Sequence, residues 1–220
     1  MKIYSTLFFY CFAHYFLCQN SEVRDNSYNT VTIGNQTWMT DNLNVSQFQN
    51  GDIIPEAKTN EEWKIAGENR QPAWCYSNES SYVNEKLYNY WAIVDSRELA
   101  PVGWHIPKYS ELKVLVDYLG GDQIASQKLK SSVGWEFKSK STNSSGFNAL
   151  PIGSRGLDGG FNSFGKKVTY WSSETLQDLS NLFINGYGLT LINPKDKKNE
   201  KVYWQTPNAE SGNSIRLIKD

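Results

Sequence analysis

Leu99-Ala-Pro-Val-Gly-Trp-His-Ile-Pro (99–107) leads into an amphipathic segment that runs from Ser110 to Leu119. Apolar side chains in that segment recur at the i, i+3, i+4, i+7 spacing of one helix face, at Leu112, Leu115, Val116 and Leu119. Gly120-Gly121 then provides a C-terminal stop signal. The pattern predicts a proline-bounded turn from an extended segment into a helix that packs on the core.

Before and after this helix, segments near both ends of the chain have patterns typical of β-strands. Thr30 to Met39 alternates around Gly34-Asn35, which is typical of a hairpin. Helices are also expected after a capping-box pattern at Thr59 and Glu62, and over Lys86 to Val94. Short β-prone runs follow at 147–152, 169–172, 182–184, 201–204 and 214–218. We therefore expect the α+β class, with two or three helices, a small irregular antiparallel β core and long loops.

The N-terminus predicts export. Residues 1–20 combine a positive Lys2 with an apolar stretch that is too short to cross a bilayer, as in a signal peptide. Residues 21–29 are a polar linker, and one domain is expected over 30–220. Two alternatives stay open: ordinary cleavage near residues 17–21, or lipidation at Cys18, which would give the protein its membrane contact.

Several phrases resemble one bacterial family, the Fibrobacter succinogenes major paralogous domain. The resemblance covers about residues 30 to 220 and is carried by VTIGNQTWMTDNL (31–43), GDIIPEA (51–57), QPAWCY (71–76), LAPVGWHIP (99–107), GFNALP (146–151) and YWSS (170–173). It implies an exported protein, secreted or displayed on the cell surface, of bacteria such as the Bacteroidetes.

The phrase at 103–107, with the helix after it, is also similar to a motif of C-type-lectin-like folds, so the resemblance implies that fold. Fold alone does not establish function. The chain departs from the family where Lys108 replaces the usual Ser or Thr helix cap, so Ser110 is expected to cap a shorter helix. It departs again at Ser214-Ile-Arg-Leu-Ile, which lacks the cysteine that commonly ends this strand.

Few residues suited to catalysis or metal binding are present. The net charge of −1 gives no field that favours nucleic acid. His105 is the only histidine after residue 20, which excludes HExxH zinc chemistry, and we interpret it as structural. Cys75 is the only cysteine after Cys18, so no internal disulfide is expected and a buried, inert thiol is favoured. Acids are too sparse in the late loops for a lectin-type calcium site. We expect no catalytic residue, metal or cofactor.

Aromatic residues make up 14% of the chain, and most are expected in the core. Those assigned to the core are Trp38, Trp74, Trp91, Trp104 and Trp171. Aromatic faces beside amides suit sugar rings or a protein partner. The ligand-binding candidates on this ground are Tyr187, Tyr203, Trp204, Gln205 and Asn208. Arg155 and Arg216 could pair with buried acids, and such a pair would be structural.

Three functions remain open on these observations. The favoured one is an exported, non-catalytic module that binds an extracellular glycan or protein. The second is a structural component of a surface assembly. The third is a hydrolase that uses an unrecognised carboxylate site, for which paired acids in a concave pocket would be required.

Overall fold

The computed structural model describes residues 28–77, 84–137, 141–177, 184–195 and 199–220. Four strands form one sheet in the order β1-β2-β11-β5: Thr30–Ile33, Gln36–Met39, Ile218–Lys219 and Trp104–His105. A second sheet has the order β10-β9-β8: Val202–Gln205, Ile184–Ile192 and Lys167–Gln177. Two ribbons pair β3 (Trp74–Tyr76) with β4 (Lys86–Tyr88), and β6 (Ser154–Arg155) with β7 (Phe161–Asn162). All these pairings are antiparallel, and the α+β class is confirmed.

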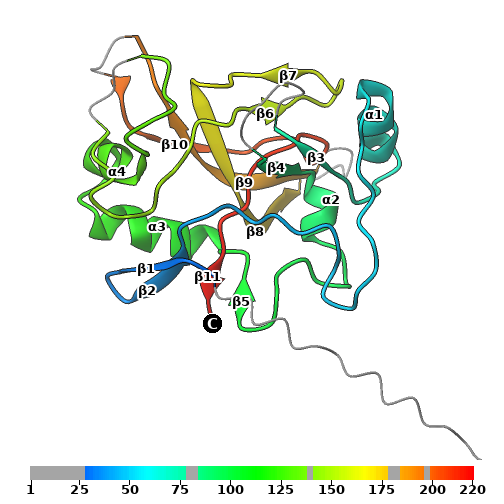
Figure 1. Ribbon diagram of the computed structural model, residues 1–220, viewed down its shortest axis with the longest axis horizontal. Coiled ribbons are helices and arrows are strands. Elements are labelled where there is room, and N and C mark those ends of the chain that lie inside the picture. Colours follow the sequence, from blue (N-terminus) through cyan, green and yellow to red (C-terminus); the bar gives the residue numbers. More distant parts are fainter. Residues whose placement is uncertain (1–27, 78–83, 138–140, 178–183, 196–198) are drawn as a thin grey trace, which may run out of the picture.

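The two ends of the described chain lie side by side. Ile218 of β11 pairs with Trp38 of β2 on one side and with His105 of β5 on the other. Figure 1 shows the resulting sheet below the long β8–β9 hairpin. The hairpin expected near the N-terminus is confirmed, with Ile33 opposite Gln36 at its turn.

Helices α3 (Tyr109–Tyr118) and α4 (Asp122–Leu129) pack on each other and on the β8–β10 sheet. The sequence signal for α3 is confirmed, but Lys108 is its N-cap, so the expected cap at Ser110 is wrong. The carboxylate of Glu111, at the third helical position, accepts the Lys108 N–H at 2.7 Å, which is the half of a capping box that does not need a hydroxyl cap. α4 was not predicted, because the glycines that end α3 are followed at once by a second helix.

Around α1 (Asn60–Glu68) and α2 (Tyr90–Ile93), one prediction is confirmed and another is wrong. Thr59 and Glu62 form the expected capping box of α1. The helix expected over 86–94 is instead strand β4 followed by the short α2. Asn89 separates them: its backbone is extended, and its Oδ1 accepts the N–H groups of Ala73 and Ala92. That amide therefore caps α2 and joins it to the chain before β3.

The core consists of two adjoining clusters of buried side chains. One joins α3 and α4 to the β8–β10 sheet, and the other surrounds Trp74, Tyr88 and Trp171. Four of the five tryptophans assigned to the core are buried, whereas Trp104 is partly buried and packs on Tyr28 with ring centroids 5.8 Å apart. The run at 147–152 forms no strand and contributes Phe147 to the core as irregular chain.

Candidate functional site

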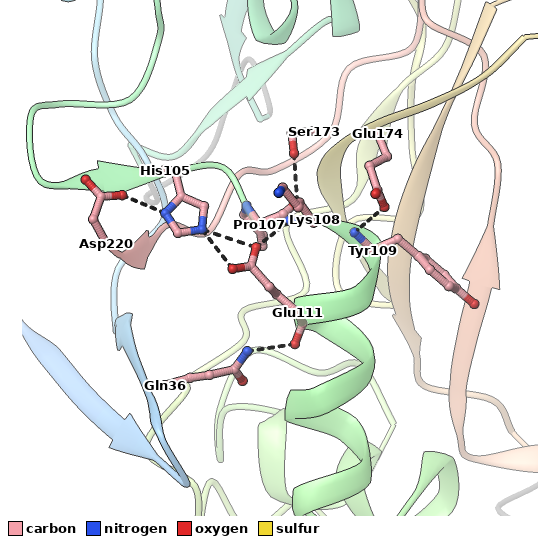
Figure 2. Close-up of polar contacts among 9 residues, drawn as sticks. All are labelled: Gln36, His105, Pro107, Lys108, Tyr109, Glu111, Ser173, Glu174 and Asp220. Carbon is pink, nitrogen blue, oxygen red and sulfur yellow. Dashed lines mark hydrogen bonds and ion pairs between the residues drawn. The ribbon is translucent and has the colours of Figure 1, made fainter.

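A bulge in strand β8 meets the first turn of α3. The β8–β9 register shifts between Trp171 and Thr175, which turns the intervening residues out of the ladder. The N–H of Ser173 donates to Pro107 O at 2.9 Å. Glu174 Oε2 accepts the N–H of Tyr109 at 2.8 Å (Figure 2). These bonds hold the bulge against the helix N-terminus, where a carboxylate is favoured by the helix dipole.

An open hollow of about 660 Å³ lies at this junction. Its lining residues are Tyr109, Ser173, Glu174, Thr175 and Tyr187. The two tyrosine rings have centroids 5.0 Å apart at an interplanar angle of 43°. Serine, glutamate and threonine are exposed, whereas both tyrosines are half-buried. The hollow thus presents flat aromatic surface beside hydroxyl and carboxylate groups.

Of the five ligand-binding candidates from the sequence, Tyr187 alone lines this hollow. Trp204 packs behind it, edge-on to Tyr109 with centroids 5.0 Å apart, and its Nε1–H donates to Asp122 at 3.1 Å. The side chain of Lys113 lies over the same indole, 4.8 Å from its centroid. Trp204 therefore supports the aromatic wall from the core side.

The other three candidates lie elsewhere. Tyr203 and Gln205 flank Trp204 along β10, so alternation puts their side chains on the opposite face of the sheet. The hydroxyl of Tyr203 donates to Asn199 O at 2.7 Å. Asn208 Oδ1 accepts the N–H of Glu210 at 2.8 Å, which stabilises a turn.

The sequence reasoning missed four residues of the hollow: Tyr109, Ser173, Glu174 and Thr175. Two signals were available. Tyr109 stands at the start of the best-predicted helix, and Ser172-Ser173-Glu174 follows a buried tryptophan with polar residues in place of strand alternation. Neither signal shows that the two segments meet.

His105 joins the terminal sheet to α3. Its Nδ1 lies 2.7 Å from Asp220 Oδ1, and its Nε2 lies 3.0 Å from Glu111 Oε1, as Figure 2 shows. Gln36 of β2 also donates to Glu111 O at 3.0 Å. Burial lowers the pKa of His105, but the hydrogen bonds and charges of the two carboxylates outweigh it, so the net shift is upward. Both ring nitrogens are engaged, and the contacts position the helix that carries Tyr109.

Cys75 is buried on strand β3 and forms no disulfide within the described part of the chain. Burial raises the pKa of its thiol to about 11, against a smaller opposing effect of the Arg155 charge. The thiolate needed for nucleophilic chemistry is therefore scarce near neutral pH. The interpretation of Cys75 as a small buried side chain is confirmed.

The pairing with buried acids that Arg155 and Arg216 left open is not found among the described residues. Arg155 donates to the carbonyl oxygens of Ala57, Thr59 and Gly159. The guanidinium of Arg216 is held by Asn42 Oδ1 and by backbone carbonyls, and the amide of Asn42 in turn donates to a Glu85 carboxylate. Carbonyl dipoles satisfy the guanidinium donors in both cases.

Among the described residues, no group of three or more His, Cys, Asp and Glu side chains is arranged to hold a metal ion. Within the same part of the chain, no helix has the length and apolar character needed to cross a membrane. The expected signal peptide, most of the linker, and Cys18 lie outside the described residues.

Comparison with known proteins identifies the family to which the chain belongs. No curated protein and no solved structure is significantly similar to the chain. The model of the Fibrobacter succinogenes major domain matches residues 31–219, which include every strand and helix that the structure describes apart from the first residue of β1. The chain therefore belongs to the Fibrobacter succinogenes major domain family.

Proposed function

We propose that the protein is exported, and that its domain is a non-catalytic module that binds carbohydrate outside the cell. One observation carries the proposal: the hollow in which Tyr109 and Tyr187 lie beside three exposed polar side chains. Apolar ring faces next to a few fixed polar groups are typical of small-ligand sites. The apolar face of a sugar ring packs on an aromatic face in the same way.

The polar groups suit the hydroxyls of a sugar. Glu174 Oε2 already accepts the Tyr109 N–H, which fixes the carboxylate, and its Oε1 has no hydrogen bond to another described residue. That oxygen is available to accept from a sugar hydroxyl. Ser173 and Thr175 on either side are exposed, and their hydroxyl groups can donate or accept.

The proposal also includes export of the protein and the type of fold that the domain adopts. The signal-like residues 1–20 support export, and N-terminal sequencing of the mature protein would test it. We propose a C-type-lectin-like arrangement on three grounds: β2 pairs with β11, α3 follows β5 directly, and long irregular segments connect the strands. An experimental structure whose topology differs from that fold would contradict this part.

A glycan array followed by calorimetry on the best ligand tests carbohydrate binding. We expect Tyr187→Ala to weaken binding at least about tenfold, which is roughly 1.4 kcal/mol. Tyr203→Ala is the matched control, because this half-buried tyrosine lies on the other face of the same sheet and should leave affinity unchanged. Glu174→Gln, which keeps an oxygen for the Tyr109 N–H, should weaken binding less.

Three results would count against the proposal. Equal losses in the Tyr187 and Tyr203 variants would place binding elsewhere. A clean negative on the array, with capture of an envelope protein that Tyr187→Ala abolishes, would make the ligand of this hollow a protein. Concentration-dependent self-association without either ligand would favour the structural role.

A further inference from the structure

A second hollow, of about 510 Å³, lies on the other face of the β8–β10 sheet. Its lining includes Ser154, Asn162, Lys167, Gln205 and Asn213. The β6–β7 ribbon borders it, since Gly153 bridges to Val168 next to Lys167. Strand alternation puts Lys167 and Gln205 on the face opposite Leu189 and Tyr187, so this hollow is distinct from the first.

Three side-chain amides in the second hollow present NH₂ groups as hydrogen-bond donors. Gln205 Oε1 accepts a hydrogen bond from the Thr190 hydroxyl at 3.1 Å. The oxygen of that amide therefore already has a partner, and its NH₂ group remains to donate to a ligand. Asn162 Oδ1 accepts a hydrogen bond from Ser154 Oγ at 2.8 Å, so the Asn162 NH₂ group likewise remains to donate to a ligand. Asn213 is 2% exposed, and its Nδ2 has no partner among the described residues. A buried NH₂ group without an acceptor costs free energy, which a ligand oxygen would recover.

The charge in this hollow is positive. The ammonium group of Lys167 has no hydrogen bond or ion pair to another described residue, and burial lowers its pKa. Arg155 also borders the hollow. Its guanidinium donates to carbonyl oxygens, which carry no net charge and so leave its positive charge without a counter-ion. No Asp or Glu is among the described residues that line the hollow. Asp158, in the β6–β7 turn, accepts the Gly160 N–H and is not part of the lining.

We propose that the second hollow binds the carboxylate or sulfate group of a small ligand, such as an acidic sugar. Lys167 would donate a charge-assisted hydrogen bond to one anionic oxygen, and the NH₂ groups of Gln205 and Asn213 would donate to the others. A cationic ligand is disfavoured, because two positive side chains border the site and no acid does so among the residues that the structure describes. The proposal is independent of carbohydrate binding at the Tyr109–Tyr187 hollow.

The test uses the full chain and three probes: glucuronate, glucose as its uncharged counterpart, and inorganic sulfate. Binding is followed by amide chemical shifts, which locate the site, and by calorimetry. We expect glucuronate to shift the resonances of Lys167, Gln205 and Asn213, and glucose to leave them unchanged. Sulfate binding at the same residues would identify the anionic group as sufficient for recognition.

Lys167→Met removes the charge and should weaken glucuronate binding at least tenfold. The fold should survive, because the ammonium it removes has no partner among the described residues. Lys166→Met is the matched control: this neighbouring side chain is exposed and lies 3.1 Å from Glu136, away from the hollow. Gln205→Leu should also weaken binding, without loss of a charge.

Either of two results would overturn the proposal. One is the absence of shifts at these residues with both glucuronate and sulfate at millimolar concentrations. The other is an equal effect of the Lys166 and Lys167 substitutions. Because Tyr187→Ala should leave glucuronate binding at this hollow intact, failure here is distinguishable from failure of the first proposal.

Discussion

Replacement of Glu200 by Gln should destabilise the protein by about 3–5 kcal/mol, because it leaves a buried ammonium group without its counter-charge. Lys130 Nζ lies 2.7 Å from Glu200 Oε1, and their side chains are 0% and 2% exposed. Lys130 follows α4 and Glu200 precedes β10, so the pair fastens the helix to the sheet edge. At an effective dielectric constant of about 20, two charges at this distance attract by roughly 6 kcal/mol.

Two effects limit the loss in Glu200→Gln. Lys130 keeps its hydrogen bond to Ile192 O at 2.5 Å and its position 4.7 Å from the Trp135 ring centroid. It can also lose its proton, which at pH 7 costs a lysine about 5 kcal/mol. Burial already lowers the pKa of Lys130, against the opposing effect of Glu200, and removal of the carboxylate lowers it further. The destabilisation should therefore shrink as the pH rises toward 10.

Urea unfolding at pH 7, followed by tryptophan fluorescence, measures the free energy of unfolding. The expected loss corresponds to a fall in Tm of roughly 6–20 °C for a domain of this size. Glu136→Gln is the matched control, since the Glu136–Lys166 pair has side chains 44% and 52% exposed and should contribute less than about 1 kcal/mol. The double variant Lys130→Met/Glu200→Leu should recover most of the stability, because no buried charge remains. A loss below about 1 kcal/mol in Glu200→Gln, or a double variant as unstable as the single one, would refute this reasoning.

Three further predictions concern a cap, a turn and a titrating side chain. Thr59→Ala removes the hydroxyl that caps α1 and should cost about 1 kcal/mol in urea unfolding. Gly159→Ala should cost at least about 2 kcal/mol, because φ is +84° and a Cβ would collide with the Asn60 backbone. Gly51→Ala is the control, since Gly51 has a φ of +92° but open space around it, and this substitution should cost less. Equal costs for the two substitutions would contradict the collision. The carboxylates around His105 raise its pKa, so their stabilising effect is complete below about pH 6.5 and is lost as the pH rises through the folded-state pKa. The difference in unfolding free energy between the wild type and His105→Gln should therefore shrink over that pH range. An NMR titration that gave the imidazole a pKa below about 6.5 would contradict this prediction.

Local sequence patterns predicted the elements whose signals lie within a few residues. The i, i+3, i+4, i+7 spacing located α3, the alternation around Gly34 located the first hairpin, and the pair Thr59 and Glu62 located the start of α1. Each of these signals arises from hydrogen bonds or burial within one element. They also favoured the α+β class.

Elements whose conformation depends on distant partners were predicted less well. The segment 86–94 has apolar residues at helical spacing, but β3 pairs with its first half and Asn89 ends that strand. The run 147–152 is β-prone, yet Phe147 and Ala149 are buried in the core without forming a strand, and Ala149 makes an isolated bridge to Lys130. Tertiary contacts outweigh such weak local preferences.

The sequence by itself determined the family, the absence of a second histidine after residue 20, and the aromatic character of the core. The tertiary structure alone decided which side chains come together: Tyr109 packs beside Tyr187, and Lys167, Gln205 and Asn213 line one hollow. The register of β8, β9 and β10 sends the side chains of Trp204 and Gln205 to opposite faces of the sheet, although both residues border the second hollow and both were assigned to one ligand surface. Periodicity along the chain reports which side of an element is buried, whereas a binding site depends on packing between elements that are far apart in sequence.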